Sequence, residues 1–185
     1  MTEYTMFSVP IIHYKIENWE YNKNRILDVL PHEATENLNT NSKVYTDFFT
    51  SSTYLPEYSD IIFDIIKPYL IDFSEDRKIE IIDMWYQKYY KGATHSYHNH
   101  GYCGWSSIIY VEFDLNAHQS TKFISPFNNP WGGAMELFQP PIEEGDMIIF
   151  PSNIIHEAPV NISEVRRTII SYNLRMCTDV VGKTL

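Results

Sequence analysis

The sequence predicts a mainly β fold with helices in its N-terminal part, and within that class a double-stranded β-helix, the jelly-roll or cupin-like barrel. From residue 79 onward, apolar residues alternate with a period of two and the runs end at turns containing Gly, Pro and Asn. Before residue 79 the apolar spacing is helical. Successive strands that follow helices favour an antiparallel sandwich or barrel over alternating βαβ units.

The first 78 residues are expected to support the barrel with one strand and two helices. Residues 6–16 are rich in β-branched and aromatic residues, which is typical of an extended segment. Residues 22–30 suit a short helix. Residues 59–70 carry isoleucines at helical spacing behind the N-cap candidate Ser59. Pro68 lacks a backbone amide, so it should kink or end that helix.

Residues 79–177 are expected to form the jelly-roll core, and residues 1–185 a single domain. The chain shows no internal repeat, no low-complexity tract and no linker of the kind that separates domains. Six strand-like runs follow one another here: 79–90, 106–114, 121–127, 134–139, 146–152 and 166–176.

Composition excludes several classes of protein. The formal net charge is −10 and no Lys/Arg cluster offsets it, which argues against a nucleic-acid-binding surface. No apolar run approaches the roughly 20 residues that a membrane-spanning helix needs, and the N-terminus does not resemble a signal peptide. Cys103 and Cys177 are isolated and are expected to be reduced. We therefore expect a cytoplasmic protein, or a host-cytoplasmic one if the source is viral.

Three of the seven histidines fall within six residues, at positions 95, 98 and 100. Residues i and i+2 of a strand face the same side, so His98 and His100 can direct both imidazoles at one point, as two metal ligands would. His95 lies outside this period and suits either the surface or a place behind the ligands. A third ligand must come from another strand, and His156 is the candidate. The other histidines are expected to be ordinary polar or surface residues: His13, His32 and His118.

An adjacent pair of arginines completes the pattern. Arg166 and Arg167 are neighbours on a predicted strand, so only one of them can point into a barrel. A buried arginine is costly unless it is paired, and an anionic ligand that accepts its forked N–H groups would justify it. The histidines and the arginine together describe an iron centre beside a dicarboxylate cosubstrate.

These residues resemble the Fe(II)- and 2-oxoglutarate-dependent oxygenase superfamily. More narrowly, they resemble a small group whose pattern is His-x-His, a short loop, Ser and a Tyr-rich strand. Here that pattern is His98-Asn99-His100, GYCGW, Ser106 and IIYV, followed by GDMIIFPSNIIHEAP and the strand from Arg167 to Asn173. Trp85 stands where the group carries a Trp. The resemblance covers about residues 80–175 and does not reach the first 75 residues.

The resemblance implies a dioxygenase that uses Fe(II), 2-oxoglutarate and O₂ to hydroxylate an unidentified substrate, with prolyl-hydroxylase-like chemistry within its range. It implies His98, His100 and His156 as iron ligands and Arg167 as the clamp for the distal carboxylate of 2-oxoglutarate. Trp131 would either cap the substrate opening or cover the sheet. Further candidates for holding the cosubstrate and shaping its pocket are Tyr89, Ser106, Tyr110 and Asn173.

One departure from the superfamily leaves the metal open. His100 stands where a carboxylate is usual, so three neutral imidazoles would leave the centre at +2 rather than +1. A His-only set also serves zinc hydratases, and Glu157 or a water could complete the shell instead of His100. Arg167 favours iron with 2-oxoglutarate, because a zinc-hydroxide enzyme needs no buried guanidinium at that spacing.

Two rival classes of function stay open. One is a cupin-like Fe or Zn enzyme that does not use 2-oxoglutarate, and the other is a jelly-roll binding module whose histidines are incidental. The primary substrate cannot be read from the sequence, because the loops that select it carry no general code. The polar segment 33–58 suits either a lid or an interface, so a homodimer is a further expectation.

Overall fold

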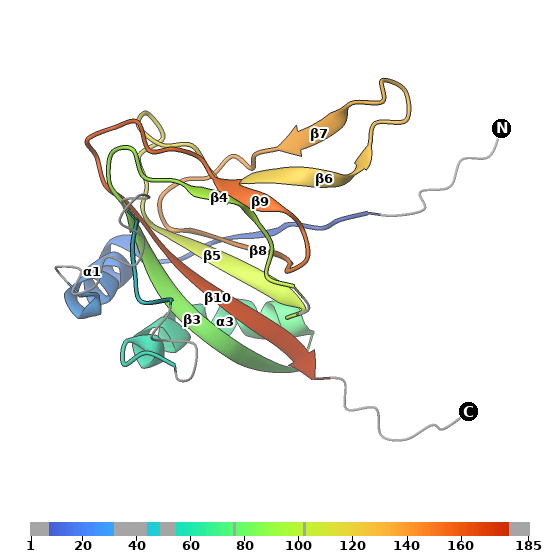
Figure 1. The fold of residues 1–185 in the computed structure, drawn as a ribbon. Coiled ribbons are helices and arrows are strands. Elements are labelled where there is room, and N and C mark those ends of the chain that lie inside the picture. The colour runs from blue at the N-terminus through green and yellow to red at the C-terminus, as the bar shows by residue number, and fades with distance from the viewer. Residues whose placement is uncertain (1–7, 32–43, 49–54, 76, 102, 178–185) are drawn as a thin grey trace, which may run out of the picture.

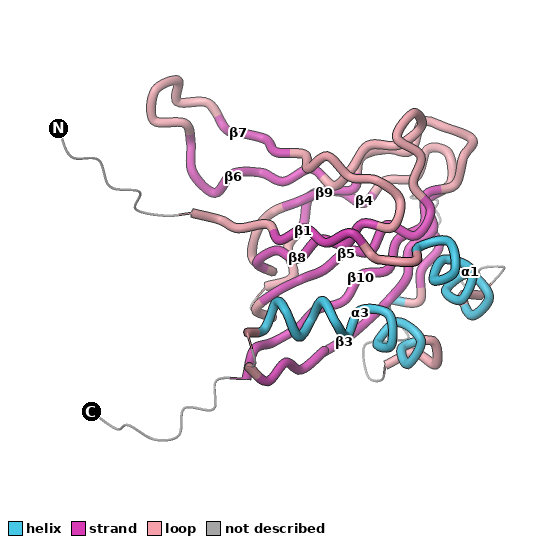
Figure 2. Tube along the Cα trace, turned by 180° about the vertical axis from the view of Figure 1, so that it is seen from behind, coloured by secondary structure: helices cyan, strands magenta, loops and turns pink. Residues whose placement is uncertain are grey.

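The fold is known from a computed structural model, which describes residues 8–31, 44–48, 55–75, 77–101 and 103–177. Two antiparallel sheets face each other, and the two helices lie against the outer face of the larger sheet (Figures 1 and 2). This arrangement confirms the mainly β, jelly-roll class that the sequence predicts. Positions 6 and 7, His32 and much of the polar segment 33–58 lie outside the described residues.

The larger sheet has six strands, in the order β1-β8-β5-β10-β3-β2. Their bounds are β1 Ile12–Lys15, β8 Asp146–Pro151, β5 Trp105–Glu112, β10 Arg167–Cys177, β3 Lys78–Tyr89 and β2 Val44–Thr46. Every neighbouring pair is antiparallel. Both edge strands come from the first 78 residues, so this part of the chain extends the sheet as well as covering it.

The smaller sheet has four strands, in the order β4-β9-β6-β7. Their bounds are β4 His95–His98, β9 His156–Ala158, β6 Lys122–Asn128 and β7 Met135–Phe138. The tip of the β6–β7 hairpin projects beyond the rest of the molecule (Figure 1). Because β4 is an edge strand, it pairs on one side with β9. The pairing is irregular between His95 and His98.

Two apolar cores lie on the two faces of the larger sheet. Helices α1 (Trp19–Val29) and α3 (Ser59–Ser74) bury Ile26, Ile62 and Ile66 against the outer face. The alternation of β10 divides its side chains: Ile170 packs in this outer core, whereas Ile169 packs between the sheets. Burial of one such isoleucine contributes about 1.5–3 kcal/mol. The core between the sheets surrounds the candidate site.

The six strand-like runs predicted after residue 79 all form strands, but three details of the N-terminal part differ from the predictions. Helix α1 begins at Trp19, after a left-handed Asn18, and not at residue 22. Tyr58, not Ser59, is the N-cap of α3, because its carbonyl already accepts a helical bond from the Ile62 amide at 3.2 Å.

Pro68 does not end helix α3, which continues to Ser74. Proline removes a single backbone hydrogen bond, while the apolar side chains that follow it, including Leu70 and Phe73, still pack against the core. Packing therefore outweighs the local cost of the proline. Neither of the two described helices has the length and apolarity that a membrane crossing requires.

Candidate metal centre

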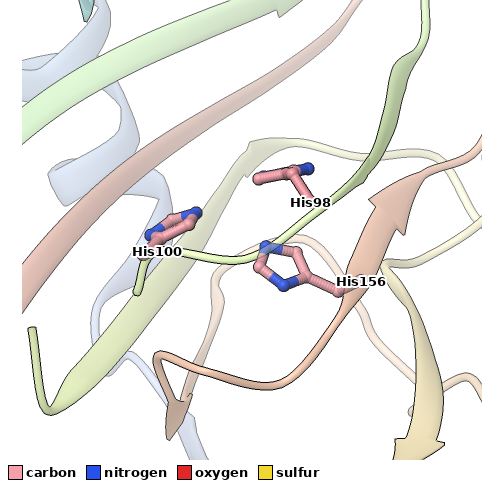
Figure 3. A group of neighbouring side chains, drawn as sticks. All are labelled: His98, His100 and His156. Carbon is pink, nitrogen blue, oxygen red and sulfur yellow. The ribbon is translucent and has the colours of Figure 1, made fainter. Parts of the chain in front are cut away.

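Three imidazoles meet between the two sheets, as Figure 3 shows for His98, His100 and His156. One nitrogen from each ring lies within 4.8 Å of the corresponding nitrogens of the other two. His98 ends β4 and is paired across the sheet with His156, the first residue of β9. His100 lies two residues beyond the end of β4, and its amide donates to the Ser152 carbonyl at 2.8 Å. It is therefore held by a loop contact and not by the strand alternation that the sequence predicts.

Hydrogen bonds fix which nitrogen of each ring carries the proton. In every ring Nδ1 faces an oxygen that can only accept: the Ser96 carbonyl at 2.7 Å from His98, the Asn173 Oδ1 at 2.7 Å from His100, and the Ile154 carbonyl at 2.9 Å from His156. Nδ1 is thus the protonated nitrogen, and in the neutral ring Nε2 keeps its lone pair. Metal-binding histidines commonly have this arrangement, with the other ring nitrogen donating to an oxygen.

Burial keeps these rings neutral. The pKa of His156 is lowered to about 3, chiefly by burial and then by the neighbouring His98. Burial also lowers the pKa of His98 and of His100. At neutral pH all three are uncharged imidazoles, the form that binds a metal without first losing a proton.

Ser106 and Asn173 lie behind the His100 ring. Ser106 is fully buried and its hydroxyl donates to the Asn173 Oδ1 at 2.7 Å, while Ser106 Oγ lies 2.9 Å from the His100 Nδ1. The backbone N–H of Asn173 in turn donates to the Asp83 Oδ1 at 3.2 Å. The sequence offered Ser106 as a candidate to hold the cosubstrate and Asn173 as one to shape its pocket, and in the structure both contact a candidate metal ligand.

Arg167 is a buried cation that lies against Tyr89. It is 3% exposed, and its guanidinium lies 4.4 Å from the centroid of the Tyr89 ring. Nη1 and Nη2 donate to the Gln119 and Pro159 carbonyls, each at 2.9 Å. Within the part of the chain that the structure describes, no carboxylate pairs with it, and burial lowers its pKa.

The neighbouring arginine faces the opposite side of β10, as the alternation predicts. Arg166 is paired with Glu112 through Nε at 2.8 Å and Nη2 at 2.7 Å. Arg167 is thus the inward member of the pair, and its positive charge lacks the compensation that Arg166 has.

Tyr89 and Tyr110 lie close to Arg167. The Tyr110 hydroxyl donates to the Thr121 hydroxyl at 2.9 Å and accepts from the Thr121 amide at 3.3 Å. The Tyr89 side chain is 1% exposed, and its ring packs against the Arg167 guanidinium. Burial raises the pKa of both tyrosines, so their hydroxyls stay protonated.

A narrow cavity connects the histidines with Tyr89 and Thr121. Its apolar lining residues include Ile108, Ile169 and Ala158. Its volume is about 20 Å³, the space of roughly one water molecule. An ion fits this space directly, whereas an organic ligand requires lining side chains to move.

Gln87 and Ser171 also line this cavity, although the sequence pattern had not singled them out. Both lie at a two-residue spacing from residues that were singled out, Gln87 from Tyr89 and Ser171 from Asn173. Extending the strand alternation one step in each case would have found them.

His95 also faces this interior. Its ring lies 3.8 Å from the His98 ring, centroid to centroid, with an interplanar angle of 17°. Its Nδ1 contacts the Gln87 side-chain amide at 3.1 Å. The sequence allowed His95 a place at the surface or behind the metal ligands, and the structure favours the place behind the ligands. Burial, with His98 and His100 nearby, lowers its pKa to about 4.

Other candidates lie away from the cluster. Glu157 is ion-paired with Lys122 at 2.8 Å, so it does not take the place of His100. His13 contacts Asp146 at 2.9 Å. Trp131 is 95% exposed and therefore does not cover the sheet.

His118 is a buried structural histidine, as expected. Its Nδ1 accepts from the Asp114 amide at 3.0 Å, and its Nε2 lies 3.0 Å from the Val165 carbonyl. Both of its ring nitrogens are occupied, so it has no free site for a metal.

A second, larger groove of about 750 Å³ lies between the β6–β7 hairpin and Val9 and Ile11. Phe123 and Phe150 line it, and their rings also contact His156, with centroids 5.8 and 4.9 Å away. These two rings therefore separate the groove from the histidine cluster.

Comparison with known proteins assigns a family to this arrangement. Residues 83–173 match the family model described as "Putative 2OG-Fe(II) oxygenase". No curated protein sequence matches the chain.

Solved structures share the fold at low sequence identity. The α-ketoglutarate-dependent epimerase SnoN from nogalamycin biosynthesis is 11% identical, with a TM-score of 0.67 over 90% of this chain and 78% of that one. HygX from Streptomyces hygroscopicus, crystallised with nickel and 2-oxoglutarate, is 8% identical, with a TM-score of 0.66 over 92% and 84%. The viral collagen prolyl hydroxylase from Paramecium Bursaria Chlorella virus-1 is 13% identical, with a TM-score of 0.56 over 89% and 96%. These similarities show the fold, and the family match lies on the strands that carry the histidines and Arg167. Residues 83–173 of this chain match the 2OG-Fe(II) oxygenase family model, and the fold is shared with solved 2-oxoglutarate-dependent enzymes.

Proposed function

We propose that this protein is an Fe(II)- and 2-oxoglutarate-dependent dioxygenase that hydroxylates a C–H bond of its substrate. The observation that carries the proposal is the pairing of two features in one interior. Three neutral imidazoles converge, and a buried guanidinium without a carboxylate partner among the described residues lies against Tyr89, which lines the same cavity. The family match and the fold of the solved neighbours support the same reaction class.

The residues present fit a divalent metal ion. His98, His100 and His156 each direct an unprotonated Nε2 away from the oxygen that holds Nδ1, which leaves three donors for one ion. Three protein ligands leave coordination positions open, as a catalytic site requires. When bound here, iron and 2-oxoglutarate supply the oxidative decarboxylation of the diacid to succinate and CO₂, coupled to oxidation of the substrate.

The chemistry of the interior also suits a five-carbon diacid, which lining side chains would have to move to admit. The lining of this interior combines the histidines with the apolar residues Ile108 and Ile169, and the cationic Arg167 lies against Tyr89, which also lines it. Each terminal nitrogen of Arg167 donates one of its two hydrogens to a carbonyl, so further N–H groups are available for a carboxylate. The Tyr89 hydroxyl and the Tyr110–Thr121 pair are the neighbouring polar groups that would orient the diacid. The same lining excludes water from the reacting end.

The test is an anaerobic titration of the protein with Fe(II), with and without 2-oxoglutarate. We expect a weak visible charge-transfer band only when both are present, and release of succinate when O₂ is admitted. Metal binding without any effect of 2-oxoglutarate would replace this proposal with a cupin-like Fe or Zn enzyme. Absence of stoichiometric metal binding would leave a jelly-roll binding module.

Whether the substrate is hydroxylated requires a separate measurement. The printed names of two solved neighbours are an epimerase and a carbocyclase, both α-ketoglutarate dependent. Mass spectrometry of substrate pools incubated with ¹⁸O₂ separates these outcomes. Hydroxylation adds one labelled oxygen atom, whereas epimerisation and ring closure leave no label in the product. A product without label would therefore overturn the hydroxylase assignment and leave the oxygenase family intact.

A further inference from the structure

We propose that His95 is a positioning residue that holds the His98 ring in the orientation for metal binding, with Gln87 as its anchor. The inference rests on the proposed metal site, and it assigns His95 no bond to the metal. His95 stacks on His98 more closely than any two of the three candidate ligands lie to each other, 3.8 Å between centroids against 4.4 Å or more.

An irregularity in β4 makes this contact possible. In a regular strand, residues i and i+3 point to opposite faces. The pairing of β4 with β9 shifts register between His95 and His98, and the shift lets both rings face the interior. The interplanar angle of 17° gives a stack over the flat faces of the rings.

His98 is the candidate ligand with the least support of its own. Its Nδ1 bond goes to the carbonyl of Ser96, two residues back on the same edge strand, and that bond is exposed. The other two rings have further support. His100 is bonded to Asn173 and Ser106 on two strands of the larger sheet. His156 has an equally local Nδ1 bond to Ile154, but its ring is buried against Phe123 and Phe150.

Gln87 connects the stack to the larger sheet. It is 6% exposed on β3, and its Nε2 lies 3.1 Å from the His95 Nδ1. Since an amide nitrogen only donates, the His95 Nδ1 is the acceptor and its Nε2 carries the proton. This tautomer is the opposite of the one in the three candidate ligands. His95 therefore has no free lone pair for the metal, and its contribution is the stack.

The test measures Co(II) affinity, by competition with a chromophoric chelator, for the full chain. His95→Ala removes the stack and should weaken binding about tenfold, in the range that residues supporting metal ligands show. His95→Phe keeps a flat ring without nitrogen and should restore binding to within about threefold of wild type. Gln87→Met removes the donor and should fall between the two. Tyr97→Ala, an exposed neighbour on the same strand, is the matched control and should leave binding unchanged.

The Co(II) affinities of these variants distinguish the stacking role of His95 from other roles. If His95→Phe binds as weakly as His95→Ala, a nitrogen of His95 is required and the stacking role is wrong. If His95→Ala binds Co(II) as wild type does but loses 2-oxoglutarate affinity, His95 contacts the cosubstrate and the inference fails. If wild type itself binds no Co(II), the proposed function fails, independently of His95. Near-ultraviolet circular dichroism of each variant checks that the fold is retained.

Discussion

The Nδ1 atom of His100 lies 2.7 Å from the Oδ1 atom of Asn173, which is 73 positions later in the chain. The bond joins the loop after β4 to strand β10 of the larger sheet. Because the amide oxygen only accepts, it sets the tautomer of the imidazole and turns Nε2 toward His98 and His156. The candidate metal centre thus depends on Asn173, which is not itself a candidate ligand.

Replacement of Asn173 by Leu should weaken metal binding by 10- to 100-fold, the usual effect of losing such a supporting partner. Leucine has a similar branched shape but removes the Asn173 acceptor, which leaves only the Ser106 hydroxyl beside the His100 Nδ1–H. Calorimetric titration with Zn(II) measures the change. Thr168→Val, a buried change on the same strand that lies against Glu112, is the control for stability effects. Equal loss in both variants would mean that general destabilisation, and not the tautomer, controls binding.

Replacement of Arg167 by Ala should lower 2-oxoglutarate affinity while metal binding stays close to wild type. Loss of one partner of a buried charge pair costs about 2–5 kcal/mol, which is roughly 30-fold or more in affinity. Arg166→Ala is a matched control one residue away, because Arg166 faces Glu112 outside the cavity. Anaerobic titration of the Fe(II)-loaded variants gives both dissociation constants. Similar 2-oxoglutarate affinity in the two variants would remove Arg167 from the cosubstrate site.

Gly145 precedes β8 with φ of +87°, and a Cβ built there would lie 2.6 Å from the Trp19 ring of helix α1. Gly145→Ala should therefore lower the free energy of unfolding by more than the conformational cost of a left-handed residue, which is about 1–2 kcal/mol. Gly133→Ala supplies that reference, since its φ is +65° and no atom lies within 4 Å of the built Cβ. Urea denaturation of both variants should show the larger loss for Gly145→Ala. Equal losses would mean that the Trp19 ring moves aside at little cost.

The sequence was informative where strand alternation is regular. Arg166 and Arg167 fall on opposite faces of β10 as expected, because a period of two needs no knowledge of tertiary contacts. The convergence of His98 with His156 was also predictable, since both flank runs that read as strands.

The sequence was uninformative where strand register or long-range pairing determines the position of a residue. The role of His95 depends on an irregular β4–β9 register that no residue pattern reports. Strand β2 has three residues within a polar stretch, and its pairing with β3 defines it as a strand. Ser106 is assigned by its bond to a residue 67 positions away, which composition and spacing cannot reveal.

Metal affinity should be almost independent of pH between 8 and 6.5. An exposed histidine has a pKa near 6.5, so at that pH three such ligands would each be about half protonated and affinity would fall roughly eightfold. In this protein burial lowers the pKa of all three candidate ligands, that of His156 to about 3. They are therefore neutral over this range. Co(II) dissociation constants at the two pH values should agree within about twofold, and an eightfold difference would contradict the burial argument.

The same shifts predict how stability of the metal-free protein depends on pH. Below about pH 6.5 the unfolded chain binds protons that the folded chain excludes, so the free energy of unfolding falls as pH decreases toward the folded values. With folded pKa values of about 4 for His95 and about 3 for His156, each contributes a loss of about 2 kcal/mol between pH 7 and pH 5. Urea denaturation at the two pH values measures the total. His156→Leu should reduce this pH dependence by one residue's share, because leucine removes the titrating group while the apolar surroundings remain. An unchanged pH dependence in His156→Leu would show that His156 is not the neutral buried ring described here.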